Sequence, residues 1–309
     1  MATEARLPRI DFSGVDPSSP GAGRWAAVRA QVVDALATLG CFDAHYPALT
    51  PDLRAAFFDG AVKELFALPA DAKRRNTYGP DKPLFGYLGG MPGLSNDYES
   101  LAISERVEPQ SSSAPSPTSC GPTQTTPASG TQTERTTASE VVHGAARRMA
   151  ELEEAVQRMV MEGLGGGKVP WRDEGVDAAR VPDGSEVIRH GTHQDCSMLT
   201  VICQHGEVDG LEVQTGDGQW VRYKPSSPAS LVVMAGKELR AWTNDRVRAP
   251  FHRVVVGGDV ARYVAILFAL PGLRIQAPAE LPHCNDDFMR FCIAQGARHE
   301  DKLRDFCGV

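Results

Sequence analysis

The chain has 309 residues, of which 42% are hydrophobic and 23% charged, so it can bury a large core and global disorder is excluded. Its formal net charge is −7 and its basic residues are scattered, which argues against nucleic acid or an anionic membrane as a partner. It has neither a membrane-length apolar run nor an apolar leader after Met1, so we expect a cytoplasmic protein without a membrane partner.

The 7 cysteines show no regular spacing and no C-x-x-C pair. An odd number of cysteines in a long chain argues against a disulfide framework, and the missing pair argues against a zinc site made of thiolates. We therefore expect reduced thiols, most of them buried.

The first 106 residues are predicted to form a helical N-terminal region. Residues 7–12 resemble a short strand, and apolar residues recur at three- and four-residue steps over 24–39, which predicts an amphipathic helix. A strand over 41–44 and a second helix over 51–69 are expected to follow.

Residues 107–139 differ sharply from the rest, because Ser, Thr, Pro and Gln dominate and large apolar side chains are almost absent. Such a segment cannot bury enough surface to offset its ordering entropy, so we predict that it is disordered. The abrupt change also fits an aberrant, frame-shifted or mis-spliced stretch between two regular blocks. A helix over 140–164 is predicted next, ended by three consecutive glycines.

Residues 140–309 are predicted to combine that helix with a β-rich core and a C-terminal helix over 286–306. Alternating apolar residues predict strands over 198–204, 211–214, 219–223, 231–235, 252–256 and 263–269. Several short strands separated by Gly, Asp and Pro turns indicate an antiparallel sandwich or barrel. The stretch 169–191 is predicted to be loop-like.

A candidate metal site begins with His193 and Asp195, which are separated by one residue just before a predicted strand. In an extended chain these two side chains point the same way, so both can reach one ion. His252, which opens another predicted strand, is the candidate third ligand. Two histidines and one carboxylate form the facial set that binds iron(II) and leaves positions open for other ligands.

Arg262 is the candidate binding residue for a carboxylate cosubstrate. We expect a hairpin through Gly257, Gly258 and Asp259 to return the strand over 263–269 beside the strand of His252, and so to bring the guanidinium near the metal. The planar fork of arginine suits a bidentate pair with a carboxylate. A zinc hydrolase with the same three ligands is an alternative, but it leaves Arg262 without a role and lacks an identifiable general base.

The chain resembles the plant 2-oxoglutarate/Fe(II)-dependent dioxygenase superfamily over residues 7–105 and 140–309. The matching pieces are LPRIDFS, ALATLGCFDAHY, ELFALPADAK, FGYLGG, HQDCSMLTVICQ, DGLEVQTGDGQWVRYKP, SLVVMAGKELRAWTND, FHRVVV and RYVAILFALP. The segments GLEVQTGDGQW and VVMAGKELRAWTN are most similar in sequence to the AOP-like subgroup. The resemblance implies a mainly β protein with flanking helices, whose core is a double-stranded β-helix, or jelly roll.

The resemblance also implies the chemistry. Fe(II) would be held by His193, Asp195 and His252, and 2-oxoglutarate would chelate the iron with its distal carboxylate on Arg262. Reaction with O2 would oxidise a small plant metabolite, most simply by hydroxylation, and release succinate and CO2, with ascorbate as a supporting reductant.

Two positions depart from the pattern that the family implies. The family usually carries Arg-x-Ser, in which the serine hydroxyl also binds the distal carboxylate, whereas Val264 follows Arg262 at that spacing here. The family also places a tyrosine on a strand before the H-x-D motif, and this chain has none between residues 167 and 193. A catalytically impaired relative that serves as a binding or scaffold protein is therefore the alternative hypothesis.

Overall fold

The computed structural model describes residues 6–77, 86–89, 98–103, 132–165, 172–181, 184–206, 210–258, 261–271, 275–276 and 282–283. The predictions for residues 107–131 and for a helix over 286–306 lie outside these residues.

The larger sheet contains the most deeply buried strands of the protein, since every residue of its central strands β7 (Leu199–Gln204) and β10 (Ser230–Ala235) is buried. Within the described residues it has eight strands. In spatial order they are β1 (Arg9–Asp11), β2 (Cys41–His45), β10 (Ser230–Ala235), β7 (Leu199–Gln204), β12 (Arg262–Pro271), β5 (Arg172–Val181), β4 (Glu99–Ile103) and β3 (Tyr87–Gly89). All neighbours pair antiparallel except β1 and β2.

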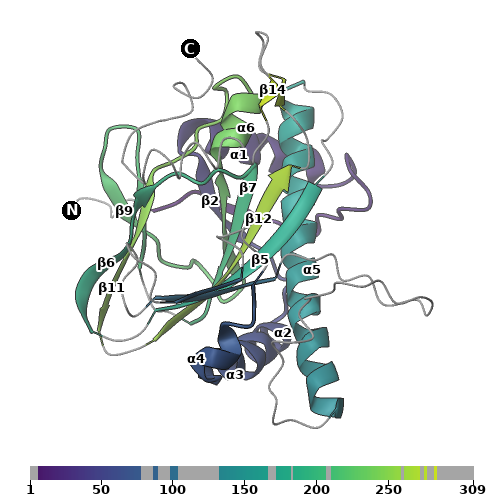
Figure 1. Cartoon of the computed structure of the whole chain (residues 1–309). Helices are drawn as coiled ribbons and strands as arrows, with labels where there is room; N and C mark the ends of the chain where they lie inside the picture. The colour runs from purple at the N-terminus through teal and green to yellow at the C-terminus, as the bar shows by residue number, and fades with distance from the viewer. Residues whose placement is uncertain are drawn as a thin grey trace.

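A second, four-stranded sheet faces the first. Its order is β6 (Gly184–His193), β11 (His252–Gly258), β8 (Leu211–Gln214) and β9 (Trp220–Arg222), all antiparallel. A short pair, β13 (Ile275–Gln276) with β14 (Pro282–His283), lies apart from both sheets. In Figure 1, β6 and β11 lie on one side of the roll and β5, β7 and β12 on the other, which confirms the predicted jelly roll.

The protein has seven helical elements in its described residues, and two of them, the first and the fifth α-helices, pack against the larger sheet. The seven elements are α1 (Trp25–Thr38), α2 (Pro51–Ala55), the π-helical turn η1 (Ala56–Val62), α3 (Lys63–Ala67), α4 (Ala70–Lys73), α5 (Gln132–Gly163) and α6 (Lys237–Trp242). The long helix α5 runs beside β7 and β12 (Figure 1). It begins at Gln132, before the predicted residue 140, because helix formers such as Glu134 and Arg135 extend it into the polar segment.

Side-chain alternation assigns the residues of β7 to two faces. Val201 packs with buried residues of α1 and α5, whereas Ile202 packs with Leu211 and Val213 of the smaller sheet. Because alternate residues of a strand point to opposite faces, Thr200, Ile202 and Gln204 all face the space between the sheets. Strand β12 pairs with β7 in register, Val264 with Gln204 and Ile266 with Ile202, so its even-numbered residues face the same space.

Two sequence predictions about strands are wrong. The stretch 169–191 contains β5 and most of β6 rather than a loop, since these strands are stabilised by long pairing with β12 and β11 and not by their own apolar alternation. The expected hairpin between the strands that start at His252 and Arg262 does not form. Strand β11 pairs with β6 and β8, and β12 pairs with β5 and β7 in the opposite sheet.

The remaining general expectations concern thiols and membranes. Cys41 and Cys203 are buried free thiols and Cys196 is partly buried, as expected for these positions. Burial raises the pKa of the Cys41 thiol to about 12 and that of Cys203 to about 11, so both stay protonated at neutral pH. Every helix in the described ranges is too short or too polar to cross a lipid bilayer.

Candidate metal centre

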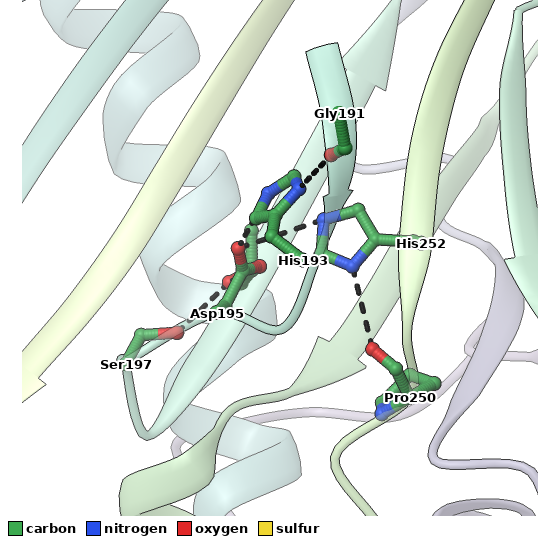
Figure 2. Close-up of polar contacts among 7 residues, drawn as sticks. Gly191, His193, Asp195, Ser197, Pro250 and His252 are labelled. Atoms are coloured by element: carbon green, nitrogen blue, oxygen red, sulfur yellow. Dashed lines mark hydrogen bonds and ion pairs between the residues drawn. The ribbon is translucent and has the colours of Figure 1, made fainter. Parts of the chain in front are cut away.

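The two histidines of the candidate site meet because their strands are paired. His193 is the last residue of β6 and His252 the first of β11, and the antiparallel register places them directly opposite each other. Their rings stand side by side, with centroids 4.1 Å apart. Asp195 lies in the bend that leads from β6 into β7, and its carboxylate turns towards both rings (Figure 2).

The three side chains offer ligand atoms to a common point. Oδ1 of Asp195 lies 3.5 Å from Nε2 of His193 and 3.6 Å from Nε2 of His252. All three ligand atoms lie within 4.8 Å of one another. Ligands bound at about 2.1 Å on perpendicular axes are about 3 Å apart, so small side-chain movements suffice to close the set around one ion. The donor set therefore fits a transition metal held on one side only.

Backbone carbonyls select the ring nitrogen that each histidine presents to the site. Nδ1 of His193 lies 2.8 Å from the carbonyl oxygen of Gly191, and Nδ1 of His252 lies 3.4 Å from that of Pro250 (Figure 2). A carbonyl oxygen only accepts, so each Nδ1 carries the hydrogen. The lone pair of each Nε2 is then directed at the site, which is the arrangement common to histidine ligands.

Hydrogen bonds also fix the carboxylate of Asp195. The hydroxyl of Thr200 donates to Oδ2 across 2.6 Å and lies 2.9 Å from the hydroxyl of Ser197. The backbone N–H of Lys237 donates to the carbonyl oxygen of Asp195 across 2.8 Å. With Oδ2 engaged by Thr200, Oδ1 is the oxygen that faces the two imidazoles.

The protonation states of the buried pair match those of metal ligands. Burial and the neighbouring His193 together lower the pKa of the His252 imidazole to about 4, against the opposing effect of Asp195, so this ring is neutral at pH 7. Burial raises the pKa of the Asp195 carboxyl, but the two histidines and the Thr200 hydroxyl outweigh it and hold the pKa below its usual range. The site thus presents one negative oxygen beside the neutral His252 ring.

Gln194, the central residue of the H-x-D motif, connects the two ligand segments. Its side chain is buried, and its Nε2 donates to the carbonyl oxygen of Ala249 across 2.7 Å. Ala249 lies in the segment just before His252. Sequence reasoning missed both Gln194 and Thr200, although their positions beside the ligands could have drawn attention to them.

Arg262 lies in the other sheet but still reaches the space next to β11. An added Cβ at Gly210 would lie 3.1 Å from Nε of Arg262, and the carbonyl oxygen of Gly210 accepts from the backbone N–H of Val255 on β11. Arg262 is 3% exposed, and its Nη2 donates to Oε1 of Gln204 across 3.0 Å. Arg262 therefore approaches β11 from across the roll, and not through the expected hairpin.

The register gives the separation of the two candidate subsites. Val255, beside which Arg262 lies, is three residues along β11 from His252. Three residues of a regular extended strand span about 10 Å, and the register shifts in β11 between His252 and Val255 make this an upper bound here. This is the order of length of a five-carbon diacid together with a contact at each end.

Fold and site together define the class of protein. Residues 177–271 match the sequence profile of the 2OG-Fe(II) oxygenase superfamily, and the chain belongs to this family of 2-oxoglutarate- and iron-dependent enzymes. Within the family it groups with plant AOP-like dioxygenases. It is 33% identical over 332 residues, 95% of each chain, to "Probable 2-oxoglutarate-dependent dioxygenase AOP1.2" of Arabidopsis thaliana.

Two further matches are with a relative that is named as inactive and with a solved structure. The chain is 28% identical over 370 residues to "Probable inactive 2-oxoglutarate-dependent dioxygenase AOP2" of Arabidopsis thaliana, covering 89% of this chain and 88% of that one. It also superposes with a TM-score of 0.73 on the crystal structure of a dioxygenase for auxin oxidation in rice. That pair is 27% identical and covers 97% of this chain and 99% of the rice chain.

Proposed function

We propose that this chain uses Fe(II), 2-oxoglutarate and O2 to oxidise a small plant metabolite in the cytoplasm, most simply by hydroxylation, with release of succinate and CO2. In this proposal His193, Asp195 and His252 hold the iron and Arg262 binds the distal carboxylate of 2-oxoglutarate. The observation that carries the proposal is the convergence of two Nε2 atoms and one carboxylate oxygen within 4.8 Å.

His193, Asp195 and His252 would hold the metal by three ligand atoms, and the cosubstrate and O2 would bind at the positions that these leave open. Iron with bound 2-oxoglutarate supplies the oxidising chemistry, in which O2 cleaves the 2-oxo acid to succinate and CO2 while the substrate is oxidised. The chain's own contribution is to keep the ligand atoms oriented. The carbonyls of Gly191 and Pro250 fix the two rings, and Thr200 fixes the carboxylate.

Arg262 would orient the cosubstrate. Its guanidinium lies beside Val255, at most about 10 Å along β11 from His252, and a five-carbon diacid can bridge such a span from the iron to the arginine. Its burial strengthens a carboxylate pair, because little water competes for the hydrogen bonds. The apolar side chains of Ile202 and Val264 on the same face help to keep water out of this space.

A small organic acid is the substrate class that we would test first. The rice protein in the comparison is named for oxidation of auxin, and it is similar to this chain over nearly the full length of both. Its substrate is not transferred to this chain by that likeness, but it makes aromatic and other small plant acids a sensible first panel.

The alternative is an inactive relative that binds iron or 2-oxoglutarate without turnover. Two observations support this alternative. Val264 stands in place of the expected serine, and the chain is similar to a relative named as inactive.

The test has two stages. Anaerobic addition of 2-oxoglutarate to the Fe(II) protein should produce the weak visible charge-transfer band of the chelate, and Asp195→Ala should abolish it. Admission of O2 should then yield succinate, even without the prime substrate. A band without succinate supports the inactive relative, and no band in folded wild-type protein overturns the proposed site.

A further inference from the structure

The structure assigns a cosubstrate-binding role to Gln204. We propose that its Nε2 donates a hydrogen bond to the distal carboxylate of 2-oxoglutarate while its Oε1 holds Arg262 in place. This inference rests on the proposed function, since it assumes that Arg262 receives that carboxylate.

The two strands bring the relevant side chains to one face. The antiparallel register of β7 and β12 places Gln204 directly opposite Val264. Arg262 is two residues from Val264 on the same strand, so its side chain emerges on the same face of the sheet. All three residues are buried, with exposures of 4%, 2% and 3% for Gln204, Val264 and Arg262.

The contact with Arg262 fixes the orientation of the glutamine amide. A guanidinium only donates hydrogen bonds, so the atom of Gln204 that lies 3.0 Å from Nη2 must be the oxygen. The NH2 group of Gln204 is then directed away from Arg262. This Nε2 is buried and has no hydrogen-bond partner within the part of the chain that the structure describes.

A buried donor without an acceptor is unfavourable, so the site calls for an acceptor beside Arg262. The side chain of Val264, directly across from Gln204, has no polar atom that could accept this hydrogen bond. A carboxylate has two oxygens and can accept from a guanidinium and an amide together. A serine at position 264 would have supplied an uncharged donor beside the charged Arg262. Gln204 supplies such a donor instead, from the neighbouring strand.

The experiment measures the dissociation constant of 2-oxoglutarate from the anaerobic Fe(II) protein by its charge-transfer band. The same titration with 2-oxobutyrate, which has the same chelating end but no distal carboxylate, isolates the contribution of that carboxylate. The variants are Gln204→Met, which keeps length and loses the amide, Val264→Ser, and the double variant. Gln157→Met, at a buried glutamine of α5, controls for the loss of a buried amide elsewhere.

We expect Gln204→Met to weaken 2-oxoglutarate binding about tenfold or more, the effect of one hydrogen bond to a charged group, and to leave 2-oxobutyrate binding almost unchanged. Val264→Ser should improve binding more in the Gln204→Met background than in the wild type, because the new hydroxyl then supplies the missing donor. Gln157→Met should change neither constant.

Three results would overturn the assignment of Gln204. The first is wild-type affinity for 2-oxoglutarate in Gln204→Met, and the second is an equal loss of affinity for both 2-oxo acids. The third is a loss of affinity for 2-oxoglutarate alone that Val264→Ser does not relieve, because Gln204 would then only support Arg262. Failure of the wild-type protein itself to bind 2-oxoglutarate is a separate outcome, and it would overturn the proposed function as well.

Discussion

The hydroxyl of Thr200 donates to Oδ2 of Asp195 across 2.6 Å. This bond connects the beginning of β7 to the candidate metal site. Thr200 is buried and faces the space between the sheets, on the same face as Gln204 at the other end of the strand. One strand thus carries a residue that orients a metal ligand and a residue that contacts Arg262.

Replacing Thr200 by valine should weaken iron binding because Asp195 loses the bond that turns Oδ1 towards the imidazoles. Loss of such an outer hydrogen bond typically costs about 10- to 100-fold in metal affinity. Competition with a chromophoric chelator measures the affinity. Thr200→Ser keeps the hydroxyl and should stay near the wild type, and equal losses in both variants would mean that packing, not the hydrogen bond, matters.

Replacing Arg262 by methionine should raise the dissociation constant of 2-oxoglutarate about 100-fold or more, since each hydrogen bond to a carboxylate contributes about 1.5–3 kcal/mol. Arg262→Lys keeps the charge but not the planar fork and should lie between methionine and the wild type. Anaerobic titration of the Fe(II) protein provides the measurement. Iron affinity should not change in either variant, and a parallel loss of iron would place Arg262 in the metal site itself.

Gly210 leaves the room that Arg262 occupies. A Cβ added there would lie 3.1 Å from Nε of Arg262 and 3.2 Å from the carbonyl oxygen of Val255, closer than ordinary contact. Gly210→Ala should therefore displace the guanidinium and weaken 2-oxoglutarate binding several-fold without changing iron affinity. Gly60→Ala, where an added Cβ meets nothing within 4 Å, is the matched control. Unchanged binding in Gly210→Ala would mean that Arg262 adjusts freely.

The sequence predicted the strands that are rich in apolar residues but not how they are distributed between the sheets. Strands β7 and β10 are found from their own residues, because both of their faces are buried. Strand β5, which begins Arg172-Asp173-Glu174, has no such pattern, and its pairing with distant β12 is invisible locally. A short glycine-rich connection fits a hairpin and a crossing between sheets equally well, so the expected neighbour of β11 was wrong.

The site followed a similar rule. The spacing of His193 and Asp195 predicted that they share a side, and the pairing of β6 with β11 brings His252 opposite. Gln204 gave no signal of its own in the sequence. Its role depends on the register with Val264, which only the folded sheet supplies. The available hint was its spacing, because a polar residue four positions after Thr200 on a buried strand lies on the same face as Thr200.

His252 should make the metal-free protein sensitive to acid. Burial lowers its pKa from 6.5 to about 4, so the unfolded chain binds a proton at a higher pH than the folded chain does. The contribution to stability is complete above pH 6.5 and is lost as the pH falls towards 4, by about 2 kcal/mol at pH 5. Denaturant unfolding in the presence of a chelator, at pH 7.5 and pH 5, measures this loss.

The control variant His252→Gln has no imidazole to titrate, so its free energy of unfolding should fall by about 2 kcal/mol less than that of the wild type between the two pH values. Equal losses in the two proteins would show that the ring is already hydrated or charged in the folded apo state.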